Sequence, residues 1–297
     1  MNTDCLAELS GVSKRFGQIV ALDGVDLDVR RGELFALLGP NGAGKTTAIS
    51  LLLGLRQPDA GSALLFGQSP QRVEARRQIG VMMQEVTLAA ELRVRELIDL
   101  VASYYPDPLS PDDVLEMTDT APLRDRPYGK LSAGQKRQAQ FALAVCGRPR
   151  LLFLDEPTVG LDVQARELMW ATLRQLVEEG SSIVLTTHYL EEAEALADRV
   201  AVLARGRMIA SGTVSEIRGH VVRKRIACVT ALTTEEVATW PDVQSVSRDG
   251  QRLNVTVSNA ETVVRRLLAA DEDLEELEVL RAGLAEAFTE LTQEVVA

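Results

Sequence analysis

The chain has 297 residues, a formal net charge of −11 at pH 7 and an isoelectric point near 4.9. This length can hold one large and one small domain. The acidic balance gives no electrostatic footprint for binding nucleic acid or an anionic membrane surface. Its three cysteines, Cys5, Cys146 and Cys228, lack metal-ligand spacing, which predicts a reducing compartment without structural disulfides. We expect neither a signal peptide nor a membrane span, so a transport function would need another chain to supply the pore.

Residues 1 to about 85 are expected to alternate short strands with one helix. Glu33–Leu38 is a short apolar run and is predicted as a buried strand, and Thr46–Leu55 carries the spacing of a helix. Residues 39–46, which lie between them, read Gly-Pro-Asn-Gly-Ala-Gly-Lys-Thr and match the phosphate-loop pattern G-x-x-x-x-G-K-[ST].

Each residue type in this loop suits the phosphate tail of a nucleotide. Gly39, Gly42 and Gly44 would let several backbone N–H groups converge on the phosphates. Lys45 would place a positive charge on the β- and γ-phosphates, and the Thr46 hydroxyl could bind Mg²⁺. The sequence therefore predicts binding of a nucleoside triphosphate.

Residues 86 to about 148 are poor in strand signals and are predicted to be mostly helical, with interruptions at several prolines. Within this region, Ser132 is expected to cap a helix over Gln135–Val145. A serine and a glycine that open a helix make an anion-binding end, with Lys136 and Arg137 nearby. From the residues alone, both a second phosphate site and an ordinary capped helix stay open.

From residue 149 to about 220, strands and helices alternate again, which predicts a parallel sheet with covering helices. Leu151–Leu154 is a predicted buried strand that delivers Asp155 and Glu156 at its carboxyl end. Asp155 would hold the Mg²⁺ shell, and Glu156 could accept a proton from an attacking water; a solvated loop is the alternative. His188 follows a second such strand, Ile183–Leu185, and could be a site residue or a satisfied histidine at a strand end.

Arg218–Arg225 is predicted to be a charged joint, with His220 as an ordinary linker residue. Beyond it, a β-α-β-β-α-β order suggests a small ferredoxin-like domain followed by a final helix. A two-residue turn is expected at Asp249-Gly250, and a capping box from Ser258 to Glu261. The predicted strands are 226–231, 243–247, 253–257 and 274–279, and the predicted helices are 233–239, 259–269 and about 283–293. The final helix carries Leu284, Phe288 and Leu291 on one face, which would pack on the domain's own sheet or on a second subunit.

Taken in order, the motifs resemble those of the nucleotide-binding subunit of an ATP-binding cassette (ABC) transporter. The resemblance covers about the first 220 residues and is closest to bacterial drug and antibiotic exporters whose ATPase is a separate polypeptide, including the daunorubicin-resistance type. It implies an α/β P-loop NTPase cassette over 1–220, with a helical subdomain at about 86–148, and an accessory α+β domain over 221–297. The chain departs from the usual signature at Ala133, where a second glycine is common.

The resemblance also implies roles for individual residues. Phe16 would stack on adenine beside Val20, and Gln84 would contact Mg²⁺ or the attacking water and connect to the membrane partner. Glu156, His188 and Gln84 would be catalytic, and Thr46, Gln84 and Asp155 would serve the metal. The remaining nucleotide contacts implied are Asn41, Gly42, Ala43, Gly44, Lys45, Thr46 and Thr47 in one copy, with Ser132, Gly134, Gln135 and Asp162 meeting the ATP of a second copy.

The function that follows is an Mg²⁺- and ATP-dependent ATPase at the cytoplasmic face of the membrane. It would act as a head-to-tail homodimer that drives a separate permease, with no role for nucleic acid. Export of a drug, antibiotic or other small hydrophobic compound is favoured, and import is the alternative. A cytosolic ABC ATPase acting on DNA or ribosomes, and a nucleotide-sensing switch without hydrolysis, are further alternatives.

Overall fold

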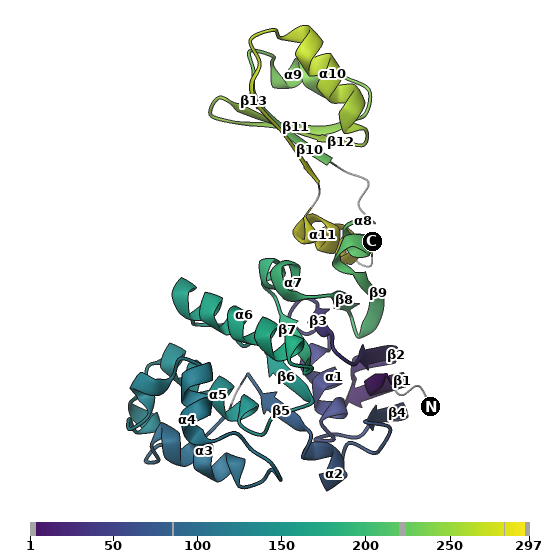
Figure 1. Cartoon of the computed structure of the whole chain (residues 1–297). Coiled ribbons are helices and arrows are strands. Elements are labelled where there is room, and N and C mark those ends of the chain that lie inside the picture. The colour runs from purple at the N-terminus through teal and green to yellow at the C-terminus, as the bar shows by residue number, and fades with distance from the viewer. Residues whose placement is uncertain (1–3, 85, 220–223, 282, 295–297) are drawn as a thin grey trace. The chain divides into compact units, whose positions relative to one another are not determined.

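The computed structural model describes residues 4–84, 86–219, 224–281 and 283–294. The chain forms two compact units, Met1–Val214 and Ser215–Ala297 (Figure 1). His220 and the middle of the predicted charged joint lie outside the described residues. In the part of the chain that is described, no helix combines the length and the apolar character that crossing a membrane requires.

A six-stranded sheet forms the centre of the first unit. Its strand order is β5-β6-β7-β3-β8-β9, and every neighbouring pair is parallel except β8 with β9. All residues of β3, β6 and β7 are buried, as expected for parallel strands covered on both faces. The strands predicted around residues 33, 151 and 183 are therefore confirmed. The six strands are β3 (Leu34–Leu38), β5 (Ile79–Met82), β6 (Leu151–Asp155), β7 (Ser182–Thr187), β8 (Arg199–Ala204) and β9 (Arg207–Thr213).

A three-stranded antiparallel sheet lies in the same unit, with the order β2-β1-β4. Its strands are β1 (Cys5–Phe16), β2 (Ile19–Arg30) and β4 (Ala60–Leu65). The expectation of short strands was wrong for β1 and β2, which have 12 residues each. Irregular register between β1 and β2 interrupts the alternation of buried and exposed residues, which hides the true strand length in the sequence.

Helix α1 (Lys45–Leu52) follows the phosphate loop and contributes Ala48, Ile49, Leu51 and Leu52 to the hydrophobic cluster that joins the two sheets. The antiparallel sheet adds Val12, Leu22 and Val25 to this cluster, and the central sheet adds Phe35, Phe153 and Val184. Helix α1 is thus fixed by buried packing rather than by its own propensity.

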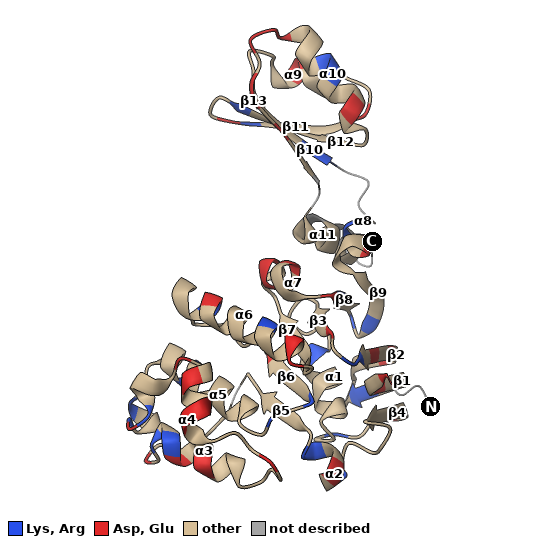
Figure 2. Cartoon of the chain, in the orientation of Figure 1, with Lys and Arg blue, Asp and Glu red and all other residues tan. Residues whose placement is uncertain are grey.

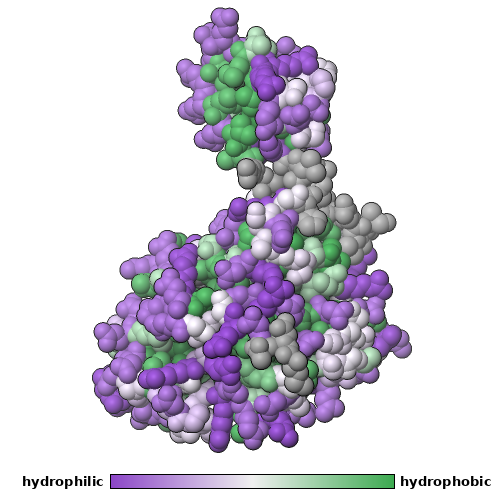
Figure 3. Space-filling model, turned by 45° about the vertical axis from the view of Figure 1, so that its right-hand side comes forward, coloured by the Kyte–Doolittle hydropathy of each residue, from purple (hydrophilic) through white to green (hydrophobic). Residues whose placement is uncertain are grey.

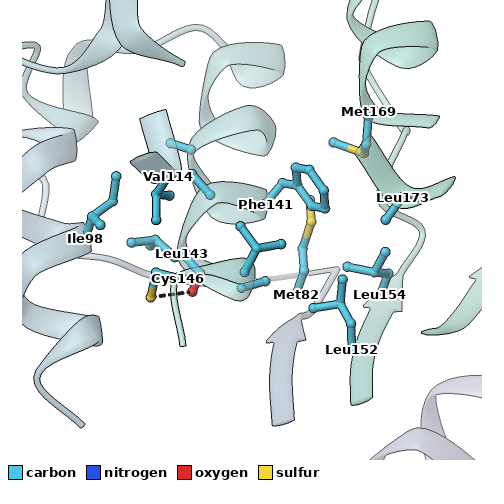
Figure 4. Close-up of a cluster of buried hydrophobic side chains, with 14 of the residues drawn as sticks. Met82, Ile98, Val114, Phe141, Leu143, Cys146, Leu152, Leu154, Met169 and Leu173 are labelled. Atoms are coloured by element: carbon cyan, nitrogen blue, oxygen red, sulfur yellow. Dashed lines mark hydrogen bonds between the residues drawn. The ribbon is translucent and has the colours of Figure 1, made fainter. Parts of the chain in front are cut away.

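The region predicted to be mostly helical contains three α-helices and two short 3₁₀ turns. A second hydrophobic cluster joins it to the sheet: Phe141 and Leu143 of α5 pack with Met82 of β5 and with Leu152 and Leu154 of β6 (Figure 4). Met169 and Leu173 of α6 complete the same cluster. The elements of this region are α3 (Val94–Ala102), α4 (Pro111–Met117), η1 (Ala121–Leu123), η2 (Tyr128–Lys130) and α5 (Ala133–Val145). The helices α2 (Val73–Arg76), α6 (Val163–Glu178), α7 (Leu190–Leu196) and α8 (Val214–Gly219) lie elsewhere in the chain.

Helix α3 carries both acidic and basic residues, whereas α4 carries acidic residues alone (Figure 2). Arg95 lies 3.9 Å from Asp99 and 4.0 Å from Asp112, and Arg124 lies 2.9 Å from Asp112. Such exposed pairs contribute little to stability, because water screens them.

The second unit contains a four-stranded antiparallel sheet with the order β11-β12-β10-β13. The predicted β-α-β-β-α-β order is present, and one face of the sheet packs on Trp240, Val263 and Leu267. Hydrophobic residues also reach the surface of this unit (Figure 3), including Leu268, Val279 and Leu280. The elements are β10 (Lys224–Val229), α9 (Thr234–Ala238), β11 (Val243–Asp249), β12 (Arg252–Val257), α10 (Ala260–Ala270), β13 (Glu275–Arg281) and α11 (Leu284–Glu294).

Helix α11 does not join the hydrophobic cluster of this sheet, to judge from the residues that the structure describes. Leu284 and Ala287 are buried, whereas Phe288 and Leu291 are half-buried. The predicted apolar face therefore exists, but it does not join the core of the domain's own sheet, which was the first of the two predicted packing partners.

Two local predictions were wrong by one residue. Asp249 pairs with Arg252, so the hairpin turn is Gly250-Gln251, with Gly250 at a φ of 59°. Glycine at the first central position supplies the positive φ that such a turn needs. The cap of α10 is Asn259, whose side chain accepts a hydrogen bond from the Thr262 N–H at 3.2 Å, and not Ser258.

This cap gives the first testable prediction. Asn259→Ala should destabilise α10 by about 1 kcal/mol, because the Thr262 N–H loses its acceptor. Hydrogen exchange at the amides of the first turn of α10 measures this change. Ser258→Ala is the matched control and should have a smaller effect; the reverse ranking would restore the capping box predicted from the sequence.

Candidate functional site: a nucleotide pocket at the carboxyl edge of the sheet

Four neighbouring parallel strands end at the same edge of the central sheet. Their order is β5, β6, β7 and β3. Gln84 follows β5, Asp155 and Glu156 end β6, His188 follows β7, and the phosphate loop follows β3. Because the carboxyl ends of parallel strands meet at one edge, residues more than 100 positions apart in the chain come together there.

The phosphate loop requires glycine at two points of close approach. A Cβ atom at Gly39 would lie 2.3 Å from the Leu203 carbonyl oxygen, and one at Gly44 would lie 2.5 Å from that of Ala21. Gly44 also has a φ of 111°, which is closed to other residues. Helix α1 starts directly after it, so its free N–H groups and positive dipole end face the loop.

Lys45 and Thr46 begin α1. The buried Lys45 ammonium donates to the Gly39 carbonyl at 2.7 Å and to the Pro40 carbonyl at 3.2 Å. Burial lowers the pKa of Lys45 below its ordinary value, and the nearby charges of Glu156 and Asp155 oppose that shift. An anionic phosphate beside Lys45 would add to the second effect and favour the charged amine.

Asp155 and Thr46 place two oxygen ligands side by side. The Thr46 Oγ1 donates to Asp155 Oδ2 at 3.3 Å, and the Thr186 hydroxyl donates to the other carboxylate oxygen. No group of three His, Cys, Asp or Glu residues that could hold a metal occurs among the described residues. Mg²⁺ at a phosphate site needs only one or two protein oxygens, because it keeps waters and substrate phosphates as ligands, so this pair fits Mg²⁺.

Glu156 is buried and strained at the end of β6. Its φ is 50°, which is uncommon for a residue with a Cβ atom and costs on the order of 1–3 kcal/mol. Its carboxylate lies 3.1 Å from His188 Nδ1 and accepts a hydrogen bond from Gln84 Nε2 at 3.4 Å. Its backbone N–H donates to Thr186 Oγ1 at 3.2 Å. Of the three residues predicted to be catalytic, Glu156 therefore contacts both Gln84 and His188.

These elements enclose a pocket of about 370 Å³, within the usual range of roughly 300–1,000 Å³ for ligand pockets. Phe16 and Val20 lie on the β1–β2 hairpin, are exposed and do not line it. Ile19 and Ala21, which the sequence analysis missed, line it instead, because successive strand residues point to opposite sides. The remaining lining residues are Asn41, Gly42, Ala43, Gly44, Lys45, Thr46, Thr47, Gln84, Glu156 and His188.

The adenine-stacking prediction for Phe16 stays a prediction. The Arg56 guanidinium lies 4.8 Å from the centre of the Phe16 ring, and the Lys14 ammonium lies 5.8 Å from it. Both are cation–π contacts, so two cations already lie against this ring. Arg56 carried no signal in the sequence, because it lies in a loop without a motif.

The signature residues do not line this pocket. Ser132 accepts a hydrogen bond from the Gln135 N–H, and the Gln135 side chain accepts one from the Ser132 N–H, both at 3.2 Å. This is a capping box at the start of α5. A Cβ atom at Gly134 would lie 3.1 Å from the Gly160 carbonyl oxygen, so the start of α5 packs closely on the loop before α6.

Asp162 has a local role that the sequence analysis did not assign. Its side chain accepts a hydrogen bond from the Ala165 N–H at 2.8 Å and caps α6. Asp162 and Ser132 are both exposed. The structure thus brings the signature and the Asp162 loop together, apart from the pocket residues of the same chain.

Arg137 is the main site residue that the sequence analysis missed. It lies on α5, is buried, and donates to the carbonyl oxygens of Met83 at 2.9 Å and Asp155 at 3.1 Å, and to that of Glu156. It was read only as a cation near the helix start. Its spacing of four residues from the buried Phe141 places both on one helix face, which is the signal that could have found it.

The phosphate loop, the oxygen pair and the buried glutamate define a P-loop nucleoside triphosphatase. The family described as ABC transporter matches residues 22–159. Nod factor export ATP-binding protein I of Burkholderia thailandensis is 40% identical over 272 residues, covering 86% of this chain and 87% of that protein. Daunorubicin resistance ATP-binding protein DrrA3 of Streptomyces coeruleorubidus is 36% identical over 304 residues, covering 97% and 96%. The chain belongs to the ATP-binding proteins of ABC transporters, which are ATPases coupled to transport.

Solved structures agree with this assignment. An ATP-binding subunit of an ABC transporter superposes with a TM-score of 0.67 at 30% identity, covering 72% of this chain and 92% of that one. A dimeric bacterial ABC transporter cassette superposes with a TM-score of 0.64 at 24% identity, covering 70% and 98%, and supports the fold alone. The ABC cassette predicted from the sequence is therefore confirmed.

Arg137 gives the second prediction. Arg137→Lys keeps the charge but cannot reach Met83 and Glu156 together, because an ammonium lacks the planar fork. We expect a stability loss of about 2–3 kcal/mol in urea unfolding and a fall in kcat of at least about tenfold. Lys136→Arg at the neighbouring position is the control and should change neither. Normal stability and turnover in Arg137→Lys would show that these hydrogen bonds are dispensable.

Proposed function

We propose that this ABC transporter ATPase powers the export of a drug, an antibiotic or another small hydrophobic compound through a separate permease. The observation that carries the ATPase chemistry is the buried Glu156 carboxylate. It lies 3.1 Å from His188 Nδ1, in the pocket that the phosphate loop also lines. Export is supported by two relatives that are 40% and 36% identical to this chain. The name of the first refers to export, and the name of the second refers to drug resistance. Import is the alternative direction of transport. The permease would determine which compound is transported.

In the proposed reaction, Glu156 accepts the proton of a water that attacks the γ-phosphorus of ATP, and the β–γ phosphate bond breaks. Lys45 holds the β- and γ-phosphates, and His188 contacts the γ-phosphate. Thr46 and Asp155 would bind Mg²⁺, with Gln84 beside it, and the ion would neutralise developing negative charge. The strained backbone of Glu156 and its contacts with Gln84 and His188 support a preorganised base.

We propose further that two copies sandwich two ATP molecules head to tail. Ser132, Gly134 and Gln135 of one copy, with its Asp162, would meet the ATP held by Lys45 of the other. The exposure of Ser132 and Asp162, and the separation of all four residues from the pocket of their own chain, support this arrangement. Hydrolysis would then remove the γ-phosphate that both copies grip and release the closed dimer.

The remaining proposals concern the domains and their place in the cell. The cassette would span about 1–220, and 221–297 would be an accessory domain. Its β-α-β-β-α-β order and its strand order β11-β12-β10-β13 support a ferredoxin-like fold. The chain would act at the cytoplasmic face of the membrane, bound to the permease and without nucleic acid. Reconstitution with the permease, and a screen for compounds that stimulate ATP hydrolysis, tests the direction and the substrate class.

The third prediction tests the base. Glu156→Gln keeps the size and hydrogen bonding of the side chain but removes proton acceptance, so kcat should fall by roughly 10²–10⁴-fold. ATP binding should persist, and the ATP-bound dimer should accumulate. Steady-state hydrolysis and sedimentation with ATP measure both effects.

Lys45→Ala serves as the contrasting control, because it should weaken ATP binding itself. Normal turnover in Glu156→Gln would remove Glu156 as the base. Unchanged ATP affinity in Lys45→Ala would contradict the phosphate-loop assignment instead.

The fourth prediction tests the shared site. Ser132→Arg places bulk and charge where the partner's γ-phosphate would sit, so monomers should still bind ATP but no longer dimerise with it. Equilibrium sedimentation with ATP, together with nucleotide binding to the monomer, separates the two effects. Lost nucleotide binding in a folded monomer would mean that Ser132 acts within its own chain.

A further inference from the structure

A buried carboxylate outside the pocket has no role in the proposed chemistry. Glu192 lies in the first turn of α7, and only 1% of its surface is exposed. Its Oε1 accepts a hydrogen bond from the Trp170 indole N–H of α6 at 3.1 Å. A buried carboxylate is costly unless it is paired, so its presence requires a physical reason.

The surroundings of Glu192 join two functional loops. Thr158, which is buried in the loop that leads from Glu156 to Asp162, lies close enough to Glu192 to oppose the rise of its pKa. Thr187, which is buried directly before His188, has the same effect on Glu192. Thr187 Oγ1 also accepts a hydrogen bond from the Tyr189 N–H at 3.0 Å, so this threonine clasps the backbone on both sides of His188.

Three buried polar atoms in this group have no hydrogen-bond partner: Glu192 Oε2, Thr158 Oγ1 and Arg166 Nε. Arg166 lies on α6, one turn before Trp170, and its guanidinium lies 5.4 Å from the centre of the indole ring. A hydroxyl and an N–H can donate, and the carboxylate oxygen can accept, so the three atoms are chemically complementary. Buried polar atoms without a partner are rare in folded proteins, so this complementary set needs an explanation.

Burial raises the pKa of Glu192, while the hydrogen bond from Trp170, the nearby Thr187 and Thr158 hydroxyls and the charge of Arg166 oppose that shift. The groups that surround it are thus donors and one cation, from α6, from the loop after β6 and from the end of β7. All of them favour an acceptor at this position.

We propose that Glu192 is a positioning residue that couples the Thr158–Asp162 loop to His188. Its Oε1 anchors the start of α7 to α6, and its free Oε2 is the acceptor that Thr158 or Arg166 reaches when the loop shifts. Because α7 begins two residues after His188, a change of this contact changes where the imidazole lies relative to Glu156. The proposal rests on the proposed role of His188 in ATP hydrolysis, and it adds a route by which the Asp162 loop acts on it.

Steady-state ATP hydrolysis by the full-length chain tests this coupling in four variants: Glu192→Gln, His188→Ala, the double variant, and Glu191→Gln. Glu192→Gln should lower kcat by about 10- to 100-fold, because small displacements of a catalytic group cost that much, and leave the KM for ATP within about twofold. Glu191→Gln is the matched control at an exposed glutamate of the same turn and should behave as the unmodified chain.

The double variant separates positioning from mere structure. If Glu192 acts through His188, the double variant should lose no more activity than His188→Ala alone. The proposal would be overturned if the activity losses of the two single variants multiply in the double variant, or if kcat is normal in Glu192→Gln. Should Glu192→Gln fail to fold, Trp170→Phe removes the donor to Oε1 while keeping an aromatic ring. It should show the same fall in kcat and the same non-additivity with His188→Ala, and a normal kcat there would be equally decisive.

The same measurements distinguish a failure of this inference from a failure of the proposed function. Glu156→Gln is run beside the four variants. Normal hydrolysis by Glu156→Gln would contradict the proposed chemistry itself. An inactive Glu156→Gln beside a fully active Glu192→Gln would reject the positioning role alone.

Discussion

The buried guanidinium of Arg137 is the constraint on which the site geometry depends. A cation inside a protein must find acceptors, and Arg137 finds them in the backbone carbonyls of Met83, Asp155 and Glu156, with Gln140 Oε1 at 3.1 Å. Burial lowers the pKa of Arg137, and the charges of Asp155 and Glu156 oppose this shift. One side chain therefore fixes three segments: the one after β5, the end of β6 and the start of α5.

This constraint explains how a strained residue persists at the centre of the site. The positive φ of Glu156 is unfavourable in isolation, but its carbonyl is held by Arg137 and its N–H by Thr186. Its side chain is held by Gln84 and His188. Contacts on all sides over-determine the conformation, so the carboxylate is positioned before any substrate arrives. The signature helix is part of the same rigid group, since α5 carries both Arg137 and the Ser132 cap.

Much of the fold was predictable because it follows from local pattern. Leu151–Leu154 is uninterruptedly apolar, and such a short apolar run is typical of a strand covered on both faces. Ser132 and Gln135 have the spacing of a capping box, and the structure forms it. The errors arose where two adjacent residues can both take the same local role. Ser258 and Asn259 can both cap α10, and the choice depends on how β12 leads into the helix, which no local pattern specifies.

The sequence by itself determined the chemistry of this protein. Phosphate and Mg²⁺ require particular residue types: the glycines, lysine and threonine of the phosphate loop, and the acidic pair at the end of β6. Within each motif these residues are close together in the sequence, so a local pattern reveals them. Only the tertiary structure decided which distant groups meet. That Arg137 binds Glu156, that Ile19 and not Val20 lines the pocket, and that Glu192 lies beside Thr158 all depend on strand register and helix docking. These are properties of the packed chain, because burial turns an ordinary polar residue into one that must find a partner.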